Sequence, residues 1–232
     1  MNDLWEIRQN PRFEGSSQYD RQEVIATITD FYHFPATLPY IQPEHILFPP
    51  SGGWPNITQD TLAALGKNDE VNQLLARLLY ISIPLHGEAK DCMIRPYTKL
   101  NNFAGEAFQA AIKHGAEWVA DEKTYIPPFV DLPEWVVSLT YGETNGDYLL
   151  LDTTDGTITR YLLDLTSYEP TYDETDPRSW RDKCDDETKP LRQYLDGIRA
   201  ELTALDGIAH FWQGEPQVLN PPESPDRAQV RR

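Results

Sequence analysis

The sequence is poor in cysteine and histidine. Two cysteines, Cys92 and Cys184, and five histidines are scattered over 232 residues, and none has the spacing of a zinc site. A phosphate-binding loop, a dinucleotide fingerprint and the Gly-x-Ser-x-Gly elbow of hydrolases are all missing. We therefore expect no metal site and no cofactor.

Long apolar runs are also missing. No segment approaches the roughly 20 apolar residues that cross a bilayer. The first residues are polar and are interrupted by Pro11, which is not the pattern of a signal peptide. We expect a cytoplasmic protein that does not bind membranes, with both thiols reduced.

Basic residues are few compared with acidic ones. The chain has 20 Lys and Arg against 37 Asp and Glu, for a formal net charge of -17. Such a chain repels polyanions at long range, so we expect no DNA binding. The charge suits a cationic ligand such as an amine, a guanidinium or a basic peptide, although acidic surfaces also serve simply to keep proteins soluble.

The first half of the chain has mainly helical patterns. Ser17 has the character of an N-cap, and apolar residues recur at helical spacing up to Pro35, which predicts a helix over 18–34. A loop rich in Pro, Gly and aromatic residues follows to Pro55. Two helices after Thr58 and Asn68, a strand over 90–98 and a helix over 105–118 are predicted next.

The second half has the strongest strand signal. Segments 135–140 and 157–163 contain several β-branched and aromatic residues, segment 148–152 is mostly an apolar run, and Asp155-Gly156 supplies turn residues for a hairpin. A helix is predicted from Thr188 to Gly207. Because strands and helices do not alternate, the pattern indicates an α+β fold, with an antiparallel meander packed against several helices.

We expect three regions along the chain. Residues 1–16 are predicted to form a loosely attached arm, residues 17–213 a single α+β domain, and residues 214–232 a disordered tail marked by several prolines.

Three features are candidates for chemistry. Asp20 and Glu23 lie three residues apart, on one helix face; such a pair holds a guanidinium or works as acid and base, or it simply complements the helix dipole. Trp54, in the Pro49–Pro55 loop, either walls a pocket or packs on the core. The acidic loop 164–187, which includes Asp185 and Asp186, either binds a cation or is a solvated loop.

Several segments together resemble a large family of fungal hypothetical proteins. The resemblance covers most of residues 18–212, and its most specific part is the segment 49–58. The segments that carry it are Asp20-Arg21-x-Glu23, Asp30-Phe31-Tyr32-x-Phe34, Leu38-Pro39-Tyr40-Ile41, Pro49-Pro50-Ser51-Gly52-Gly53-Trp54-Pro55-Asn56-Ile57-Thr58, Leu65-Gly66-Lys67, Leu150-Leu151-Asp152-Thr153 and Gly156-Thr157-Ile158-Thr159.

This family is identified as one that includes the arginine-containing cyclodipeptide synthases. The resemblance implies an enzyme of fungal secondary metabolism that joins arginine to a second amino acid as a diketopiperazine, with aminoacyl-tRNA as the donor. It implies Glu23 and Asp20 as catalytic residues, with Glu23 taking the proton of the attacking amine and Asp20 holding the guanidinium. Trp54, Asp185 and Asp186, from the features above, are the candidate substrate-binding residues. The family's motif is Asp-Asp-x-x-Glu, and Tyr19 stands here in place of its first acid.

Binding of tRNA would need a local basic patch. The cations that are candidates for one are Lys90, Arg95, Lys99, Lys113 and Lys123.

A second resemblance implies a protein that is not an enzyme. The hairpin with Asp152 and Gly156, followed by Trp180 and a closing helix, is similar to the second half of the SUKH superfamily. Its members are binding scaffolds, including immunity proteins and fungal cell-wall regulators. An acidic surface would suit a basic protein partner of such a scaffold.

Overall fold

An antiparallel meander lies at the centre of the fold. The computed structural model describes residues 10–13, 15–37, 41–85, 88–115, 125–142, 146–163, 169–184, 187–204, 208–212 and 215–219. The central sheet has the strand order β11-β10-β9-β7, and each pair is antiparallel. Its strands are β7 (Val136–Ser138), β9 (Asp147–Asp152), β10 (Thr157–Leu162) and β11 (Thr188–Pro190). The expected α+β class and the meander are therefore confirmed.

A second sheet continues from the first. It has the order β5-β6-β8, formed by β5 (Met93–Arg95), β6 (Thr98–Leu100) and β8 (Thr140–Gly142). Only Leu139 separates β7 from β8, and its N–H donates to the carbonyl of Leu149. The single strand expected over 90–98 is wrong, because Pro96 and Tyr97 form a turn and β5 folds back on β6.

Short strand pairs complete the sheets. β1 (Ile46–Leu47) pairs with β2 (Tyr80–Ile81), β3 (Ile83–Leu85) with β4 (Glu88–Lys90), and β12 (Ile208–Trp212) with β13 (Glu215–Leu219). β13 also contacts β5. Since β13 falls within residues 214–232, paired backbone extends into the segment that the sequence assigns to a tail.

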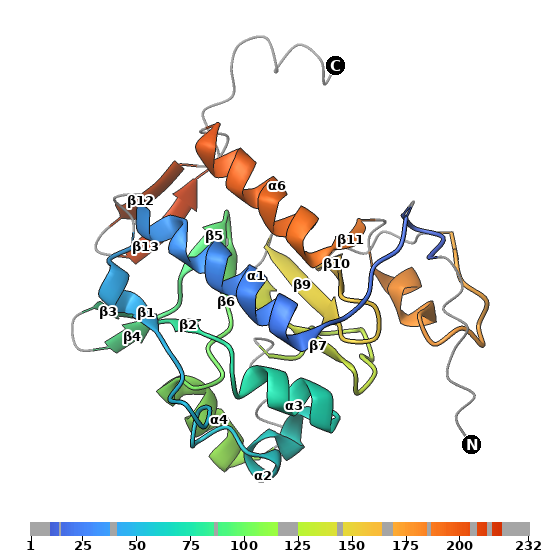
Figure 1. The fold of residues 1–232 in the computed structure, drawn as a ribbon, viewed down its shortest axis with the longest axis horizontal. Coiled ribbons are helices and arrows are strands. Elements are labelled where there is room, and N and C mark those ends of the chain that lie inside the picture. Colours follow the sequence, from blue (N-terminus) through green and yellow to red (C-terminus); the bar gives the residue numbers. More distant parts are fainter. Residues whose placement is uncertain are drawn as a thin grey trace.

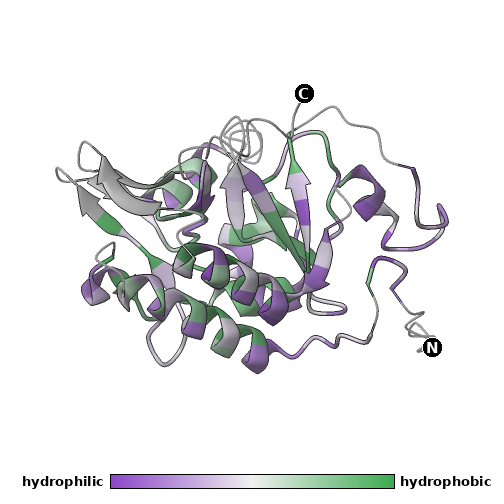
Figure 2. Cartoon of the chain, turned by 90° about the horizontal axis from the view of Figure 1, so that it is seen from above, coloured by the Kyte–Doolittle hydropathy of each residue, from purple (hydrophilic) through white to green (hydrophobic). Residues whose placement is uncertain are grey.

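Two long helices, α1 (Arg21–His33) and α6 (Leu191–Thr203), lie side by side across the sheet (Figure 1). Their apolar positions recur at helical spacing, so each helix buries one face. The buried residues are Val24, Thr27, Ile28, Phe31 and Tyr32 in α1 and Leu191, Tyr194, Leu195, Ile198 and Leu202 in α6. The polar sides face outward, as the purple outer surfaces of the helices show (Figure 2).

Both helices begin later than the sequence suggested. Asp20, not Ser17, is the N-cap of α1, and its carboxylate accepts a hydrogen bond from the N–H of Glu23. Thr188 belongs to β11, and α6 begins only after Pro190. The residue before a proline avoids helical angles, so Lys189 stays extended and pairs with Ile158 of β10.

A helical layer packs at the other end of the core. It contains α2 (Gln59–Leu62), α3 (Asp69–Leu75) and α4 (Glu106–His114). Thr58 and Asn68 cap α2 and α3 as their sequence predicted. Short 3-10 turns, Pro35–Thr37, Pro43–His45, Ala63–Leu65 and Ser179–Lys183, connect the elements.

Within the described residues, no helix is both long and apolar enough to span a membrane.

Candidate functional site

A small pocket lies where the beginnings of α1 and α6 meet the β9–β10 turn. Its volume is about 70 Å³. The N–H of Leu191 donates to the carbonyl of Gly156 at 3.1 Å, which fixes the start of α6 against the turn. The lining residues are Ser17, Gln18, Asp20, Glu23, Val24, Thr27, Gly156, Pro190, Leu191 and Arg192.

The pocket brings together the two predicted carboxylates. Asp20 and Glu23 both line it and both are exposed. One oxygen of Asp20, Oδ1, accepts the N–H of Glu23 at 2.8 Å, so half of this carboxylate serves as the helix cap. The other oxygen of Asp20 and the carboxylate of Glu23 are positioned to accept hydrogen bonds from a cation.

A guanidinium stands on the α6 side of the same pocket. Nη2 of Arg192 donates to Oγ1 of Thr27 at 2.9 Å, which ties α6 to α1. Among the residues described around this pocket, none is a histidine, a cysteine or a lysine. The pocket therefore offers paired carboxylates for a cation, beside the hydroxyls of Ser17 and Thr27.

Tyr19 serves a structural purpose. Its hydroxyl donates to Oε1 of Glu70 at 2.6 Å, and Nε of Arg21 donates to the same oxygen at 2.7 Å. Burial, followed by the Glu70 contact, raises the pKa of Tyr19. Tyr19 thus connects the start of α1 to α3.

Trp54 lies away from this pocket, as far as the described residues define its lining. Its indole Nε1 donates to the carbonyl of Leu78 at 2.8 Å, and its ring centroid is 5.8 Å from that of Tyr80. The Pro49–Pro55 loop is held by a bond from the N–H of Trp54 to the carbonyl of Ala76. These contacts match the structural alternative, in which Trp54 packs on the core.

The predicted residues Asp185 and Asp186 lie outside the described residues. Other acids of the same loop already have cationic partners, because Asp176 pairs with Arg178 at 2.8 Å and Asp182 with Arg12 at 3.0 Å. Within the described part of the chain, no group of three His, Cys, Asp or Glu side chains is arranged to hold a metal ion.

Sequence reasoning missed a buried charge cluster around Arg181. Nη2 of this fully buried arginine lies 2.7 Å from Oδ2 of Asp152, 3.0 Å from Oδ2 of Asp155 and 3.0 Å from Oγ1 of Thr157. Burial, and then the charge of Asp155, raises the pKa of Asp152 to about 6, although Arg181 opposes the shift. The pKa of Arg181 is raised by the two carboxylates against the effect of its burial.

This cluster is structural, since neither Asp152 nor Arg181 is accessible to a ligand. It ties the 3-10 turn Ser179–Lys183 to the β9–β10 hairpin. The spacing of Asp152 and Asp155 around the hairpin turn was visible in the sequence, but nothing in the sequence indicated that an arginine almost 30 residues later would neutralise them.

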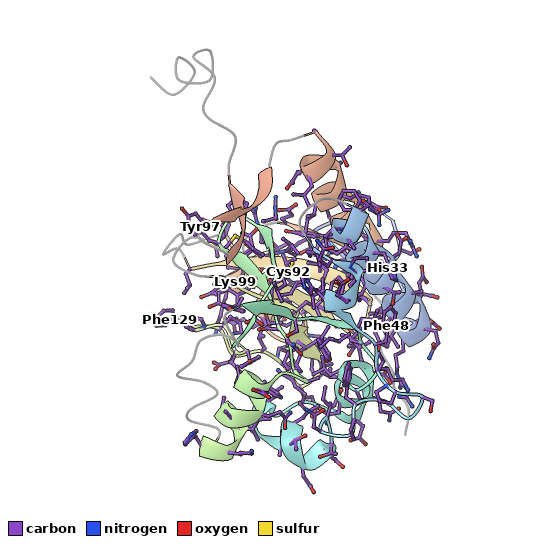
Figure 3. The ribbon with its side chains drawn as sticks, turned by 90° about the vertical axis from the view of Figure 1, so that its left-hand side faces the viewer. His33, Phe48, Cys92, Tyr97, Lys99 and Phe129 are labelled. Atoms are coloured by element: carbon purple, nitrogen blue, oxygen red, sulfur yellow. The ribbon has the colours of Figure 1, made fainter. Side chains whose placement is uncertain are left out.

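Exposed aromatic residues form a separate feature. Tyr97 and Phe129 are 49% and 84% exposed, and both have left-handed φ angles, 60° and 64°. Figure 3 shows them on the side of the molecule opposite His33 and Phe48, whose rings are 5.9 Å apart. Neither Tyr97 nor Phe129 lines the pocket.

Comparison with known proteins adds no assignment, since no family model, curated protein or solved structure matches this chain.

Proposed function

We propose that the protein is a non-enzymatic binding scaffold of the SUKH type for a basic protein partner. The observation that carries this proposal is the pocket at the α1–α6 junction, which presents Asp20 and Glu23 in a space of about 70 Å³. A basic side chain of the partner enters this space, and the two carboxylates accept hydrogen bonds from it. We place this activity in the cytoplasm.

The size of the pocket favours binding over catalysis. Sites for drug-sized ligands and cofactors occupy roughly 300–1,000 Å³, whereas this pocket measures about 70 Å³. A space of this size holds one ammonium or guanidinium group. Exposed carboxylates also remain in water, which weakens their use as a proton-transfer pair but not as part of a charged interface.

Glu23→Gln tests this proposal with little risk to the fold, because Glu23 uses its backbone rather than its side chain to complete the cap. Binding of a twelve-residue arginine-rich peptide is measured by calorimetry at low salt. We expect at least fivefold weaker binding, about 1 kcal/mol. Glu44→Gln, at another exposed acid, is the matched control and should change affinity less than twofold. Equal weakening by both variants would mean that the pocket has no specific role.

A second candidate is an arginine-containing cyclodipeptide synthase. It is favoured by one specific observation, that Asp20 and Glu23 line the same pocket. In this proposal Oδ2 of Asp20 holds the arginine guanidinium. Glu23 accepts the proton that the α-amine releases as it attacks the carbonyl of the aminoacyl-tRNA ester, and the tRNA hydroxyl leaves.

Mass spectrometry separates the two candidates. The enzyme proposal predicts new arginine-containing cyclic dipeptides in cells that express the protein, and their loss in Glu23→Gln. Soluble protein with no such product would refute it. A cyclic dipeptide that persists undiminished in Glu23→Gln would refute the role of this carboxylate.

A further inference from the structure

A second arginine site lies on the loop 169–184, and one of the chain's own residues occupies it. Nη2 of Arg12 lies 3.0 Å from Oδ1 of Asp182, and its guanidinium carbon is 5.4 Å from the centre of the Tyr172 ring. The hydroxyl of Tyr172 donates to Oδ1 of Asn10 at 2.7 Å. The Arg12 side chain is only 2% exposed. Residues 10–13 are therefore docked on this loop, although the sequence suggested a loosely attached arm.

The receptor side of this contact is held by its own loop. Both oxygens of Asp182 accept backbone N–H groups, from Thr171 at 2.8 Å and Tyr172 at 3.1 Å. Arg178 stacks over the same Tyr172 ring, with its guanidinium carbon 5.3 Å from the ring centre. The loop is anchored to the hairpin by Arg181, and the carboxylate of Asp182 is held by the loop's own backbone. The arm adds the hydrogen bond that Asn10 accepts from the Tyr172 hydroxyl.

The arm is tied less completely than the loop. Gly15, between the docked residues and α1, has a φ of 110°, and a side chain there would meet no atom within 4 Å. In Figures 1 and 2 the arm runs beside the loop at the edge of the molecule, apart from the main core. Among the described residues, Nδ2 of Asn10 is buried with no hydrogen-bond partner. A segment that satisfied the site more fully would have an advantage over the arm.

We propose that the loop 169–184 is a recognition site for an arginine in a basic segment of a protein partner, and that Arg12 fills this site in cis until the partner displaces it. The guanidinium is the group that the site fits, because its carbon lies over the Tyr172 ring while its Nη2 reaches the fixed carboxylate of Asp182. Asp173 and Glu174 are exposed beside the site and favour further cations in the same segment.

This inference deepens the proposed function and rests on it in taking the partner to be a basic protein. It does not use the Asp20–Glu23 pocket, so the two sites can be tested separately. A tethered arm competes at an effective concentration on the order of millimolar. The free site is therefore expected to bind a peptide much more tightly than the site that Arg12 fills.

The test uses the full chain and a fluorescent peptide with the sequence of residues 8–16, Arg-Gln-Asn-Pro-Arg-Phe-Glu-Gly-Ser. Anisotropy titrations compare the wild type, Arg12→Ala, and Arg12→Ala combined with Asp182→Asn. We expect Arg12→Ala to bind the peptide at least tenfold more tightly than the wild type, and the added Asp182→Asn to abolish this gain. A peptide with citrulline in place of its second arginine is the ligand control, and we expect it to bind none of the three proteins.

A second measurement keeps the test valid if the variants fold poorly. Hydrogen exchange of residues 10–13 in the wild-type protein should rise when excess peptide is added, as the arm is displaced. The proposal would be overturned if Arg12→Ala bound the peptide no more tightly than the wild type, or if the peptide left the hydrogen exchange of residues 10–13 unchanged. If Glu23→Gln lowers affinity for the arginine-rich peptide while these results are negative, the arginine site fails and the proposed function stands.

Discussion

Replacing Arg181 with methionine tests the buried charge cluster. The substitution keeps a long side chain but leaves the carboxylates of Asp152 and Asp155, which are 0% and 9% exposed, without their cation. Breaking a buried ion pair by removing one partner costs about 3–5 kcal/mol. We expect Arg181→Met to lower the free energy of unfolding at pH 7.5 by about that amount.

The raised pKa of Asp152 also predicts how the free energy of unfolding changes with pH. The pKa of Asp152 is already raised from 3.8 to about 6 in the wild-type fold. A carboxyl whose pKa is higher in the folded state binds its proton more tightly there, so stability falls as pH rises between these two values. For a shift of this size the fall is roughly 3 kcal/mol. Without Arg181 the shift grows, so the variant should recover part of its lost stability at pH 5.

Urea denaturation followed by tryptophan fluorescence at pH 5 and pH 7.5 measures both effects. Arg77→Met is the control, since Arg77 is exposed, and it should change stability by less than about 0.5 kcal/mol. A wild-type stability in Arg181→Met at pH 7.5, or an equal loss at both pH values, would refute the assignment of buried negative charge to this cluster.

Three further substitutions have defined outcomes. Gly53→Ala should lower the free energy of unfolding by about 2 kcal/mol in the same urea assay, because Gly53 has a φ of 86° and an added Cβ would lie 2.8 Å from the carbonyl oxygen of Ala76. Gly52→Ala is the control, since a Cβ at Gly52 would meet no atom within 4 Å, and its free energy of unfolding should stay near that of the wild type. Burial lowers the pKa of Lys67 from 10.5 to about 8, so between these pH values the unfolded state binds this proton and the folded state does not, and the free energy of unfolding should rise with pH. Lys67→Met should abolish this rise. A rise that persists in the variant would mean that Lys67 does not cause it. Tyr97→Gly should raise the free energy of unfolding by about 1 kcal/mol, because it relieves the strain of the left-handed φ at this residue. An unchanged or lower free energy of unfolding would mean that contacts of the tyrosine ring offset this strain.

Local signals in the sequence were sufficient to predict the meander. The apolar run 148–151 lies in β9 and the Thr- and Ile-containing segment becomes β10, and Gly156 takes the left-handed φ of 72° that the hairpin turn requires. Helix starts were less predictable because several capping residues competed. Ser17 and Asp20 are both good caps, and the helix begins at Asp20, where the neighbouring Tyr19 and Arg21 both bond to Glu70 of α3.

The candidate site was predictable only in part. The i, i+3 spacing placed Asp20 and Glu23 together, as it must on one helix. Their pocket depends on Gly156 and Arg192, which reach it from the hairpin and α6, and no local pattern indicates such long-range contacts. For Trp54 the sequence left two interpretations, a pocket wall or a side chain packed on the core. Its hydrogen bond to the carbonyl of Leu78, 24 residues later, is a long-range contact that no local pattern indicates.

Many arginines of this chain are already ion-paired, which affects whether tRNA or a basic protein is the better partner. In the part of the chain that the structure describes, seven arginines form ion pairs: Arg12, Arg21, Arg95, Arg160, Arg178, Arg181 and Arg199. Arg95, a member of the basic set that tRNA would need, is bound by Asp147 at 3.0 Å and Glu201 at 2.9 Å. A polyanion would have to displace these carboxylates and overcome a net charge of -17. A basic protein instead gains from the same charge, so the balance of cations favours the binding scaffold over an enzyme that docks tRNA.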